Sequence, residues 1–382
     1  MKEGWKIKTL GEISVRMADG PFGSNLKKEH YTDNKEVRII QLSNIGEEGW
    51  REENSKYTTF KHLETISRSE VFPNDIVIAK MMPAGRAIIC PNHEKKFVLS
   101  SDAVKVEIKK GLDLRFVLYS INSPYFRSQV YENVTGSGRV RTSLTKLRNC
   151  VLRLPSLTEQ QRIVTLLDAA FAKIDALKAN AEKNLQNAKD LFQAALKKEL
   201  EPKEGWKTMK LGEFAKMKAG DFVKASDIHS EYFEGSYPCY GGNGFRGYVK
   251  EPNKDGEYCL IGRQGALCGN VHIAIGVFRA TEHAVVVTPY EPIPILLEYY
   301  LLVGLNLNQF STGAAQPGLS VGNISDKAFI SVPPKKQQCA IANRLDALNN
   351  RCKQLQENYT KTIALCDDLK QALLTKAFNG EL

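Results

Sequence analysis

The chain carries the same segment twice. "EGWKIKTLGE" occupies residues 3–12 and "EGWKTMKLGE" occupies residues 204–213, with seven of ten positions identical. The stretches 134–171 and 311–348 are also alike: each runs from a Gly/Ser/Ala-rich loop through a short apolar strand to a proline and a Gln-Gln pair. Repetition on this scale determines the architecture, because each copy must form the same unit. The 382 residues therefore predict two mixed α/β domains built on one plan.

Each copy ends in a long segment without glycine or proline. Along both segments, apolar or small residues recur at alternating intervals of four and three, the spacing of a coiled-coil seam. The first predicted seam consists of Ile163, Leu167, Ile174, Leu177, Ala181, Asn184 and Ala188. The second consists of Ile341, Leu345, Leu348, Leu355, Tyr359, Thr362 and Leu369. Asn184 and Thr362 are polar interruptions at equivalent places, so the two seams match in register.

The two helices could each pack on their own domain, but their matched seams favour pairing with each other. An antiparallel pair would place Ala181 opposite Leu355 and Ala188 opposite Leu348, so that small residues meet large ones. The predicted fold class is α+β: two mixed α/β domains in a pseudo-twofold arrangement, separated by two long helices that form an antiparallel coiled coil. The predicted boundaries are 1–156 for the first domain, 157–200 for the first helix, 201–334 for the second domain, and 335–382 for the second helix and tail.

Composition excludes several classes of protein. Residues 294–305 are the most apolar stretch, yet they include Glu298 and are too short to span a bilayer. The N-terminal segment has no apolar core of a signal peptide. The eight cysteines are scattered without a C-x-x-C pair, which argues against a zinc site or a disulfide framework. We therefore expect a cytoplasmic protein with reduced cysteines and no membrane partner.

The net charge of +10 suggests a polyanionic partner. The charge is unevenly distributed: residues 1–157 hold 26 basic and 18 acidic side chains, whereas residues 201–334 hold 12 and 14. If both halves bind DNA, the second needs a local basic patch or phosphate contacts supplied by a partner.

Candidate DNA-binding residues lie in Gly-rich turns, where backbone and side chains can approach a polyanion closely. The first half offers Lys27 and Arg86 in stretches punctuated by Gly and Pro, and the loop 135–143 with Ser137, Arg139, Arg141, Thr142 and Ser143. The second half offers Asn243, Arg246, Arg263, Gln264 and Gln316. Arg, Asn and Gln are the side chains that read base edges through paired hydrogen bonds. A solvated turn that happens to carry two arginines remains the alternative for the loop 135–143.

Motifs that would carry catalysis are incomplete. "NSPY" (122–125) resembles the N-P-P-Y element of amino-methyltransferases, but Ser123 replaces the first proline and no F-x-G-x-G loop precedes it. "PNDIVIAK" (73–80) resembles a nuclease signature, but Ile78 occupies the position of the second carboxylate. We therefore predict no catalytic residue, metal ligand or cofactor-binding residue in this chain.

The order of these motifs resembles the specificity subunit of type I restriction–modification systems. The resemblance rests on "LPSLTEQQ" (154–161) and "VPPKKQQ" (332–338) at the start of the two helices, on "YPCYGGNGFRGY", "LIGRQGALCGNV" and "ATEHAVV" in the second half, on "DGPFGSNL" in the first, and on the closing "KAFNGEL". It covers essentially the whole chain. Two differences between the copies bear on the resemblance. The second copy has Gln337 where the first has Glu159, and the basic loop of the first half is absent from the second.

The resemblance implies a non-catalytic role in recognising double-stranded DNA. Each target-recognition domain would read one half of a bipartite, asymmetric site, and the paired helices would fix the spacer and dock two methylation subunits. S-adenosylmethionine would belong to those partners, and ATP and Mg²⁺ to restriction subunits in the full complex. Two alternatives are a self-contained DNA-modifying enzyme and a coiled-coil scaffold without DNA readout.

Overall fold

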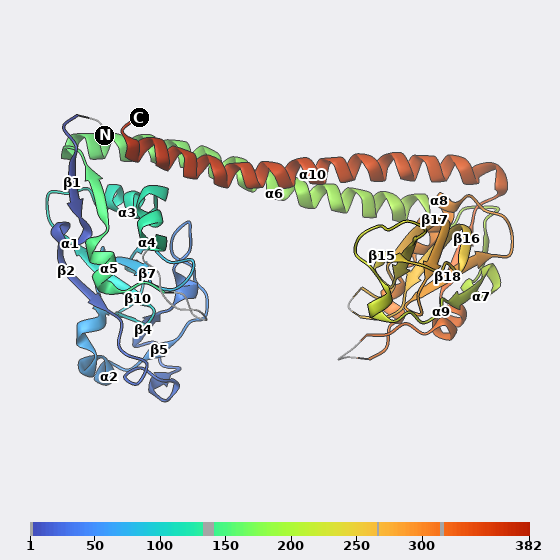
Figure 1. The fold of residues 1–382 in the computed structure, drawn as a ribbon, viewed down its shortest axis with the longest axis horizontal. Coiled ribbons are helices and arrows are strands. Elements are labelled where there is room, and N and C mark those ends of the chain that lie inside the picture. The colour runs from blue at the N-terminus through green and yellow to red at the C-terminus, as the bar shows by residue number, and fades with distance from the viewer. Residues whose placement is uncertain (1–2, 133–140, 266, 314–316) are drawn as a thin grey trace. The chain divides into compact units, whose positions relative to one another are not determined.

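The computed structural model describes residues 3–132, 141–265, 267–313 and 317–382 (Figure 1). The chain divides into two compact units: residues 1–180 with 362–382, and residues 181–361. Each unit combines sheets and short helices with parts of two long helices, α6 (Leu157–Glu199) and α10 (Lys335–Asn379). The fold is thus mixed α/β in two units, as the sequence predicts.

The first unit contains a two-stranded sheet, β1-β11, a four-stranded sheet, β2-β10-β7-β8, and a five-stranded sheet, β3-β5-β4-β9-β6. Its strands are β1 (Lys6–Thr9), β2 (Ser14–Asp19), β3 (Tyr31–Thr32), β4 (Val37–Ile40), β5 (Tyr57–Thr58), β6 (Glu70–Val71), β7 (Ile76–Ala79), β8 (Ala87–Ile89), β9 (Phe97–Leu99), β10 (Ala103–Ile108) and β11 (Val151–Leu154). Its short helices are α1 (Leu10–Ile13), α2 (Phe60–Thr65), α3 (Leu114–Asn122), α4 (Pro124–Glu132) and α5 (Leu144–Asn149).

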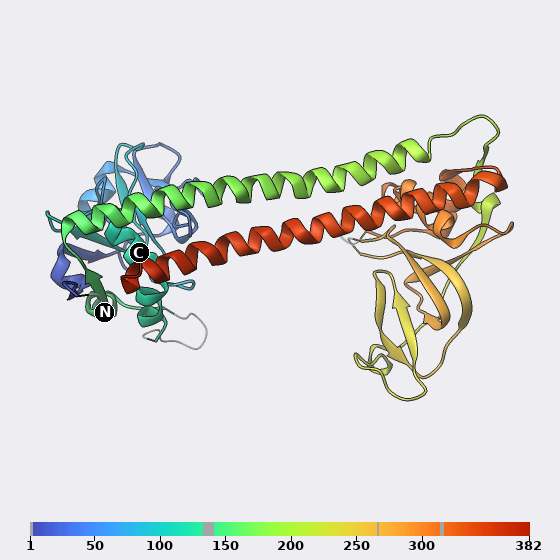
Figure 2. The same cartoon turned by 90° about the horizontal axis from the view of Figure 1, so that it is seen from above.

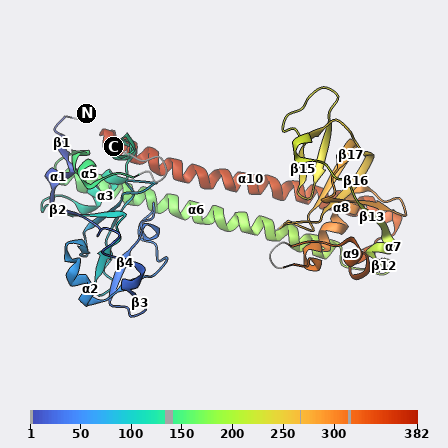
Figure 3. The same ribbon diagram turned by 60° about the horizontal axis from the view of Figure 1, so that its bottom comes forward.

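The second unit contains a two-stranded sheet, β12-β19, and a six-stranded sheet, β13-β18-β16-β17-β14-β15, whose strands can be followed in Figure 3. Its strands are β12 (Lys207–Lys210), β13 (Ala215–Ala219), β14 (Tyr237–Gly241), β15 (Gly244–Val249), β16 (Lys254–Gly262), β17 (Val271–Ala280), β18 (Ala284–Pro289) and β19 (Phe329–Val332). Its short helices are α7 (Leu211–Phe214), α8 (Ile295–Gly304) and α9 (Val321–Lys327). Helix α8 packs on β16 and β17 (Figure 1).

The two units share one sheet order. In the first unit β2 pairs with β10, β10 with β7, and β7 with β8; in the second, β13 pairs with β18, β18 with β16, and β16 with β17. Both also contain one parallel pair, β4 with β9 and β14 with β17. The units differ beyond this framework, because the first builds a separate five-stranded sheet and the second extends its main sheet by the β14–β15 hairpin. The divergent middle segments of the sequence are therefore insertions on a common framework.

The repeated segment that opens each copy forms the same local structure twice. Gly4 and Gly205 both have φ of 82°, a left-handed conformation that favours glycine. A strand and a one-turn helix follow in each copy. At the start of α1, the Glu12 carboxylate accepts a hydrogen bond from Thr9 N at 2.7 Å, and Glu213 does the same for Lys210 N at 3.1 Å at the start of α7. The repeated Gly and Glu are thus explained by a shared turn and cap.

Within the first unit, α6 and α10 run antiparallel. Arg162 Nη2 donates to Leu382 O at 2.7 Å, Lys178 pairs with Asp367 at 2.8 Å, and Lys370 pairs with Asp175. Residues later in α6 therefore pair with residues earlier in α10. The end of α10 lies beside the start of α6 (Figures 1 and 2). Ile163, Leu167 and the C-terminal Phe378 belong to the same core of this unit.

Two aspects of the predicted seams are wrong. The predicted register places residue 361 opposite Asp175, but its partner Lys370 lies nine positions further along α10. The reason is that the last turns of α10 are fixed in the first unit's core, a constraint that small-on-large matching ignores. Leu177 and Leu369 are about half exposed, at 52% and 48%. A straight helix of 3.6 residues per turn drifts away from a 3.5-residue repeat, so some seam positions rotate outward.

The remaining seam residues vary in burial. The buried ones are Ile163, Leu167, Ile174, Ala181, Ala188, Ile341 and Leu345, and the partly exposed ones are Asn184, Leu348, Leu355, Tyr359 and Thr362. All eight cysteines are free thiols, and Cys339 alone among them is exposed. Among the described residues, no helix is long and apolar enough to cross a membrane, and no cluster of His, Cys, Asp or Glu is arranged to hold a metal ion.

Candidate nucleic-acid interface

Four segments of the first unit meet at one end of its four-stranded sheet. Gly20 N donates to Ala103 O at 3.0 Å, Lys80 N donates to Asp102 O at 2.8 Å, and Thr142 N donates to Lys80 O at 2.9 Å. The strand ends and the turn before β10 are thereby held together. We call residues 20–22, 80–86, 100–102 and 141–143 the first loop face.

The second unit has the same arrangement. Gly220 N donates to Ala284 O at 3.0 Å, Arg263 N donates to His283 O at 3.1 Å, and Leu319 N donates to Arg263 O at 2.8 Å. The next residues agree as well, since Met81 forms an antiparallel bridge with Arg141, and Gln264 with Gly318. We call residues 220–222, 242–244, 263–264, 281–283 and 318–319 the second loop face. By these contacts Lys80 and Arg263 occupy equivalent positions.

The first loop face contains four of the predicted residues, Arg86, Arg141, Thr142 and Ser143. Arg141 is exposed, and Thr142 is 4% exposed with no hydrogen-bond partner for Oγ1 in the described residues. Ser143 caps α5 by accepting a hydrogen bond from Lys146 N at 3.2 Å. Arg86 lies in the turn between β7 and β8, where Nε donates to Pro83 O at 3.1 Å and burial lowers the pKa of the guanidinium.

Lys27 lies apart from these residues. Its Nζ is 3.6 Å from Glu29 Oε1, and its backbone N donates to His30 Nδ1 at 3.1 Å. The His30 ring in turn stacks on His62 of α2 with centroids 4.1 Å apart. Lys27 therefore belongs to a loop held against α2. Ser137, Arg139 and Gln316, which the sequence also singles out, lie outside the described residues.

The second loop face contains the predicted residues Asn243, Arg263 and Gln264, and Arg246 lies just beyond it on β15. The tip of the β14–β15 hairpin presses on the end of β16, because a Cβ on Gly262 would lie 1.9 Å from Gly242 O. The hairpin tip also lies close to Arg263, because a Cβ on Gly242 would lie 3.7 Å from Arg263 N. The side chains of Asn243 and Gln264 are both exposed. Arg246 is exposed and folds over Gly241, where a Cβ would meet its Cδ at 2.3 Å.

Buried polar atoms without a partner concentrate in and around this second face. Within the described residues, the atoms without a hydrogen-bond partner include Arg263 Nε, His272 Nε2, Arg279 Nε, Thr281 Oγ1, Glu282 Oε2 and His283 Nδ1. Leaving one such group unsatisfied costs about 1–3 kcal/mol. A polar ligand that supplies donors and acceptors would recover that cost, so this face is suited to bind one.

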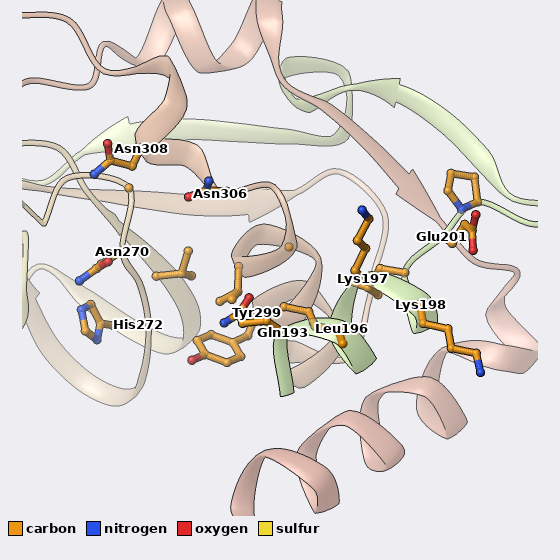
Figure 4. Close-up of a pocket in the computed structure, with 17 residues that line it drawn as sticks. Gln193, Leu196, Lys197, Lys198, Glu201, Asn270, His272, Tyr299, Asn306 and Asn308 are labelled. Carbon is orange, nitrogen blue, oxygen red and sulfur yellow. The ribbon is translucent and has the colours of Figure 1, made fainter. Parts of the chain in front are cut away.

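A cavity of about 1320 Å³ adjoins the second loop face. It lies between the end of α6, the start of β17 and the end of α8, and its polar lining includes Lys197, Lys198, Asn270, His272, Asn306 and Asn308. Figure 4 shows Asn270 and His272 side by side, with Lys197 and Lys198 directed away from each other. A Cβ on Gly244 would lie 3.0 Å from His272 Nδ1, so this lining adjoins the hairpin tip of the face. Positive charge and amide groups of this kind suit an anionic ligand.

Lys80 was not among the residues that the sequence analysis selects. The signal is present, since "DIVIAK" (75–80) and "YCLIGR" (258–263) both end an apolar strand with a small residue followed by a cation. The two segments show little identity, however, and only the shared backbone contacts align them. The turn 281–283 was missed for the same reason, because its role comes from its neighbours in the fold.

Comparisons with known proteins follow the same division into two halves. A family model described as the type I restriction modification DNA specificity domain matches residues 2–187 and 203–365. The EcoprrI specificity subunit of a type I restriction enzyme from Escherichia coli is 32% identical over 397 residues, covering 96% of each chain. A structure from work on the assembly and conformational transition of the type I R-M system superposes with a TM-score of 0.81 at 19% identity, covering 100% of this chain and 99% of that one. The HsdS subunit from Thermoanaerobacter tengcongensis superposes with a TM-score of 0.60 at 18% identity, covering 100% and 98%.

Proposed function

The chain belongs to the family of type I restriction–modification specificity subunits, and from that premise we propose that its two loop faces each read one half of a bipartite, asymmetric DNA sequence. The observation that carries this proposal is the equivalence of Lys80 and Arg263. Both are cations whose backbone N–H and C=O make the same two hydrogen bonds, at the same end of the same sheet. Two copies of one interface on one chain suit a DNA site with two parts.

The two faces would read different bases. Arg141 of the first face corresponds to Gly318 of the second, and the second face adds the hairpin residue Asn243, with Arg246 close by on the same hairpin. Different donors and acceptors at equivalent places recognise different base edges. The recognised sequence would therefore be asymmetric even though the framework is repeated.

The long helices would have a mechanical role. In this proposal the pair α6 and α10 fixes the spacer between the half-sites and docks two methylation subunits, which supply S-adenosylmethionine and methylate adenine. Restriction subunits would add ATP- and Mg²⁺-dependent cleavage in the full complex, and the assembly would act on DNA in the cytoplasm. The specificity chain itself would be non-catalytic.

A map of N6-methyladenine in cells with and without this gene tests the proposal. We expect methylation to disappear from one bipartite, asymmetric motif when the gene is deleted and to return with the wild-type gene. Methylation unchanged by deletion, in cells that express the methylation subunit, would contradict the proposal.

Reconstitution separates the alternatives. The chain assembled with its methylation subunit should bind the mapped site selectively, and the isolated chain should bind no S-adenosylmethionine in a calorimetric titration. Partner assembly without selective DNA binding would indicate a scaffold. S-adenosylmethionine binding or DNA cleavage by the isolated chain would indicate an enzyme.

A further inference from the structure

Each loop face presents one exposed phenylalanine at the same place. Phe22 is 83% exposed and Phe222 is 69% exposed. Each lies two residues after the glycine that leaves the first strand of the shared sheet, Gly20 after β2 and Gly220 after β13. Single exposed apolar residues are ordinary on protein surfaces. The same residue at the same place in two units of divergent sequence calls for a shared cause.

The backbone fixes where these rings project. A Cβ on Gly20 would lie 1.7 Å from Ser100 O, and a Cβ on Gly220 would lie 2.1 Å from Ala280 O, so both loops press directly on the neighbouring turn. No other residue than glycine can be placed there without moving the loop. The following phenylalanine is thereby carried at the edge of each face on a constrained segment.

Charged side chains and unpaired polar atoms lie near Phe222, and one cation is paired with the end of the strand that leads to Phe22. In the second unit, Phe222 lines a cavity of about 520 Å³ whose charged lining consists of the three cations Lys224, Lys250 and Arg279 and the two carboxylates Asp227 and Glu251. Arg279 Nη2 donates to Phe222 O at 3.4 Å, while Arg279 Nε and Thr281 Oγ1 have no hydrogen-bond partner among the described residues. In the first unit, Lys80 pairs with Asp19, which lies three residues before Phe22.

The chemistry of this neighbourhood identifies the ligand class. The Phe222 ring lies near three cations. A ligand that carries both negative charge and flat apolar surfaces would complement this combination. Nucleic acid has both, in its phosphates and its bases. An apolar docking site for a partner protein would need a wider apolar surface, whereas Phe222 is bordered by Lys224, Lys250 and Arg279.

We propose that Phe22 and Phe222 are equivalent DNA wedges, each inserting its ring at one base step beside the half-site read by its loop face. The inference rests on the proposed DNA-binding function and deepens it. It adds an aromatic contact to faces that also present cations and hydrogen-bonding groups. Partial unstacking at that step would make each half-site sensitive to local DNA stiffness as well as to base identity.

The test uses the chain assembled with its methylation subunits and duplexes containing the methylation-mapped site. Phe22→Ala and Phe222→Ala should each weaken binding about tenfold, because a stacked base contact is lost. The slope of log affinity against log salt should stay unchanged, because no phosphate contact is removed. The matched controls are Val15→Ala on β2 and Phe329→Ala on β19, exposed apolar residues outside both faces, at 61% and 58%.

A fluorescent base reports insertion directly. With 2-aminopurine placed at successive steps flanking one half-site, the wild-type complex should raise the fluorescence at one step, and the corresponding alanine variant should abolish that rise. Alanine variants that bind as tightly as wild type and leave the fluorescence unchanged would overturn the wedge. A second outcome would also overturn the wedge: alanine variants that assemble poorly with the methylation subunits when DNA is absent, but bind DNA normally once assembled. The rings would then contact the partner subunit and not DNA.

Failure of the proposed function and failure of the wedge would give different results. If the wild-type complex does not select the mapped site, the proposed function fails. If the wild-type complex selects the site and the alanine variants match it in affinity and fluorescence, the wedge alone fails. Melting temperatures equal to wild type exclude loss of folding as the cause of weaker binding.

Discussion

Lys80 Nζ lies 2.7 Å from Asp19 Oδ1, so the cation at the centre of the first loop face is oriented by the residue that ends β2. The Lys80 side chain is only 14% exposed. Arg263, at the equivalent position of the second face, has no partner for its buried Nε within the described residues. The two faces thus hold their central cations differently.

Substituting these cations should affect one half-site each. Lys80→Ala should relax selectivity at the first half-site, and Arg263→Ala at the second, each by about 1–3 kcal/mol if the side chain contacts a base. Binding of the assembled complex to duplexes with single base changes in either half measures this. Asp19→Asn is the informative companion, because it keeps Lys80 but removes its orienting charge. Equal losses at both half-sites would contradict a separate role for each cation.

The glycine that starts each loop should tolerate no side chain. Gly20→Ala places a Cβ 1.7 Å from Ser100 O, which requires the loop or the turn to move. We expect a loss of about 1–3 kcal/mol in the free energy of unfolding, together with weaker binding at the first half-site. Gly23→Ala is the matched control, because its Cβ meets nothing within 4 Å. Chemical denaturation measures the free energy of unfolding of both variants. Equal values would argue against the close contact at Gly20.

The sequence was sufficient for the framework but not for the faces. The repeat around Trp5 and Trp206 and the long segments without Gly or Pro predict two units and two long helices, because these signals depend on local conformation. The faces depend on which segments meet in space. Lys80 and Arg263 lie in segments with little identity, and only the backbone hydrogen bonds that flank them show that they are equivalent.

The predicted helix register failed for a related physical reason. Matching small residues with large ones uses only the two seams, whereas the ends of α10 are also held by the domain core that contains Leu374 and Phe378. A sequence pattern describes one element at a time. The competing contacts that fix its ends lie elsewhere in the chain.

Glu48 should stabilise the first unit at neutral pH. Its carboxylate accepts hydrogen bonds from Lys370 at 3.1 Å and from Lys178 at 3.4 Å, linking a loop to both long helices. The hydrogen bond from Lys370 holds the pKa of Glu48 below its ordinary value of 4.5. A lowered carboxyl pKa stabilises the fold above about pH 4.5, and that stability is lost as the pH falls through the lower, folded-state pKa.

Because Glu48 is more than half exposed, we expect Glu48→Gln to cost only about 0.5–1 kcal/mol at pH 7. The difference from wild type should shrink when urea unfolding is repeated at acid pH. Glu29→Gln, at an exposed carboxylate paired with Lys27 at 3.6 Å, serves as the control and should change little. A Glu48→Gln effect that is the same at both pH values would exclude the ionic contribution.

Glu298 should have the opposite pH dependence. It is 3% exposed in α8, its Oε1 has no partner in the described residues, and burial raises its pKa to about 7. Between about pH 4.5 and 7 the carboxyl is ionised when unfolded but protonated when folded, so the fold loses stability as the pH rises through this window. Above about pH 7 it ionises in both states and the loss becomes constant.

Glu298→Gln removes the ionisation. Its stability relative to wild type should therefore rise between pH 5 and pH 7, by up to about 3 kcal/mol, and then level off. Hydrogen exchange of the α8 amides measures the stability of the unit that contains this residue. Glu291→Gln, at an exposed carboxylate, should show no such trend. A constant difference between Glu298→Gln and wild type across this range would mean that Glu298 is ionised in the folded protein.

Two residues that the sequence assigns to the same seam should differ in how much stability an introduced charge costs. Ala188 in α6 is 4% exposed, whereas Leu177 in the same helix is 52% exposed. Ala188→Lys would bury an uncompensated ammonium group and should cost about 3–5 kcal/mol, whereas Leu177→Lys should stay within about 0.5 kcal/mol of wild type. Thermal melts followed by helical circular dichroism distinguish them. Both positions satisfy the 4,3 spacing equally, so that spacing alone predicts equal destabilisation of the two variants. The expected contrast follows only if α6 is packed on one side, as the structure has it. Equal destabilisation would support the seam predicted from the spacing.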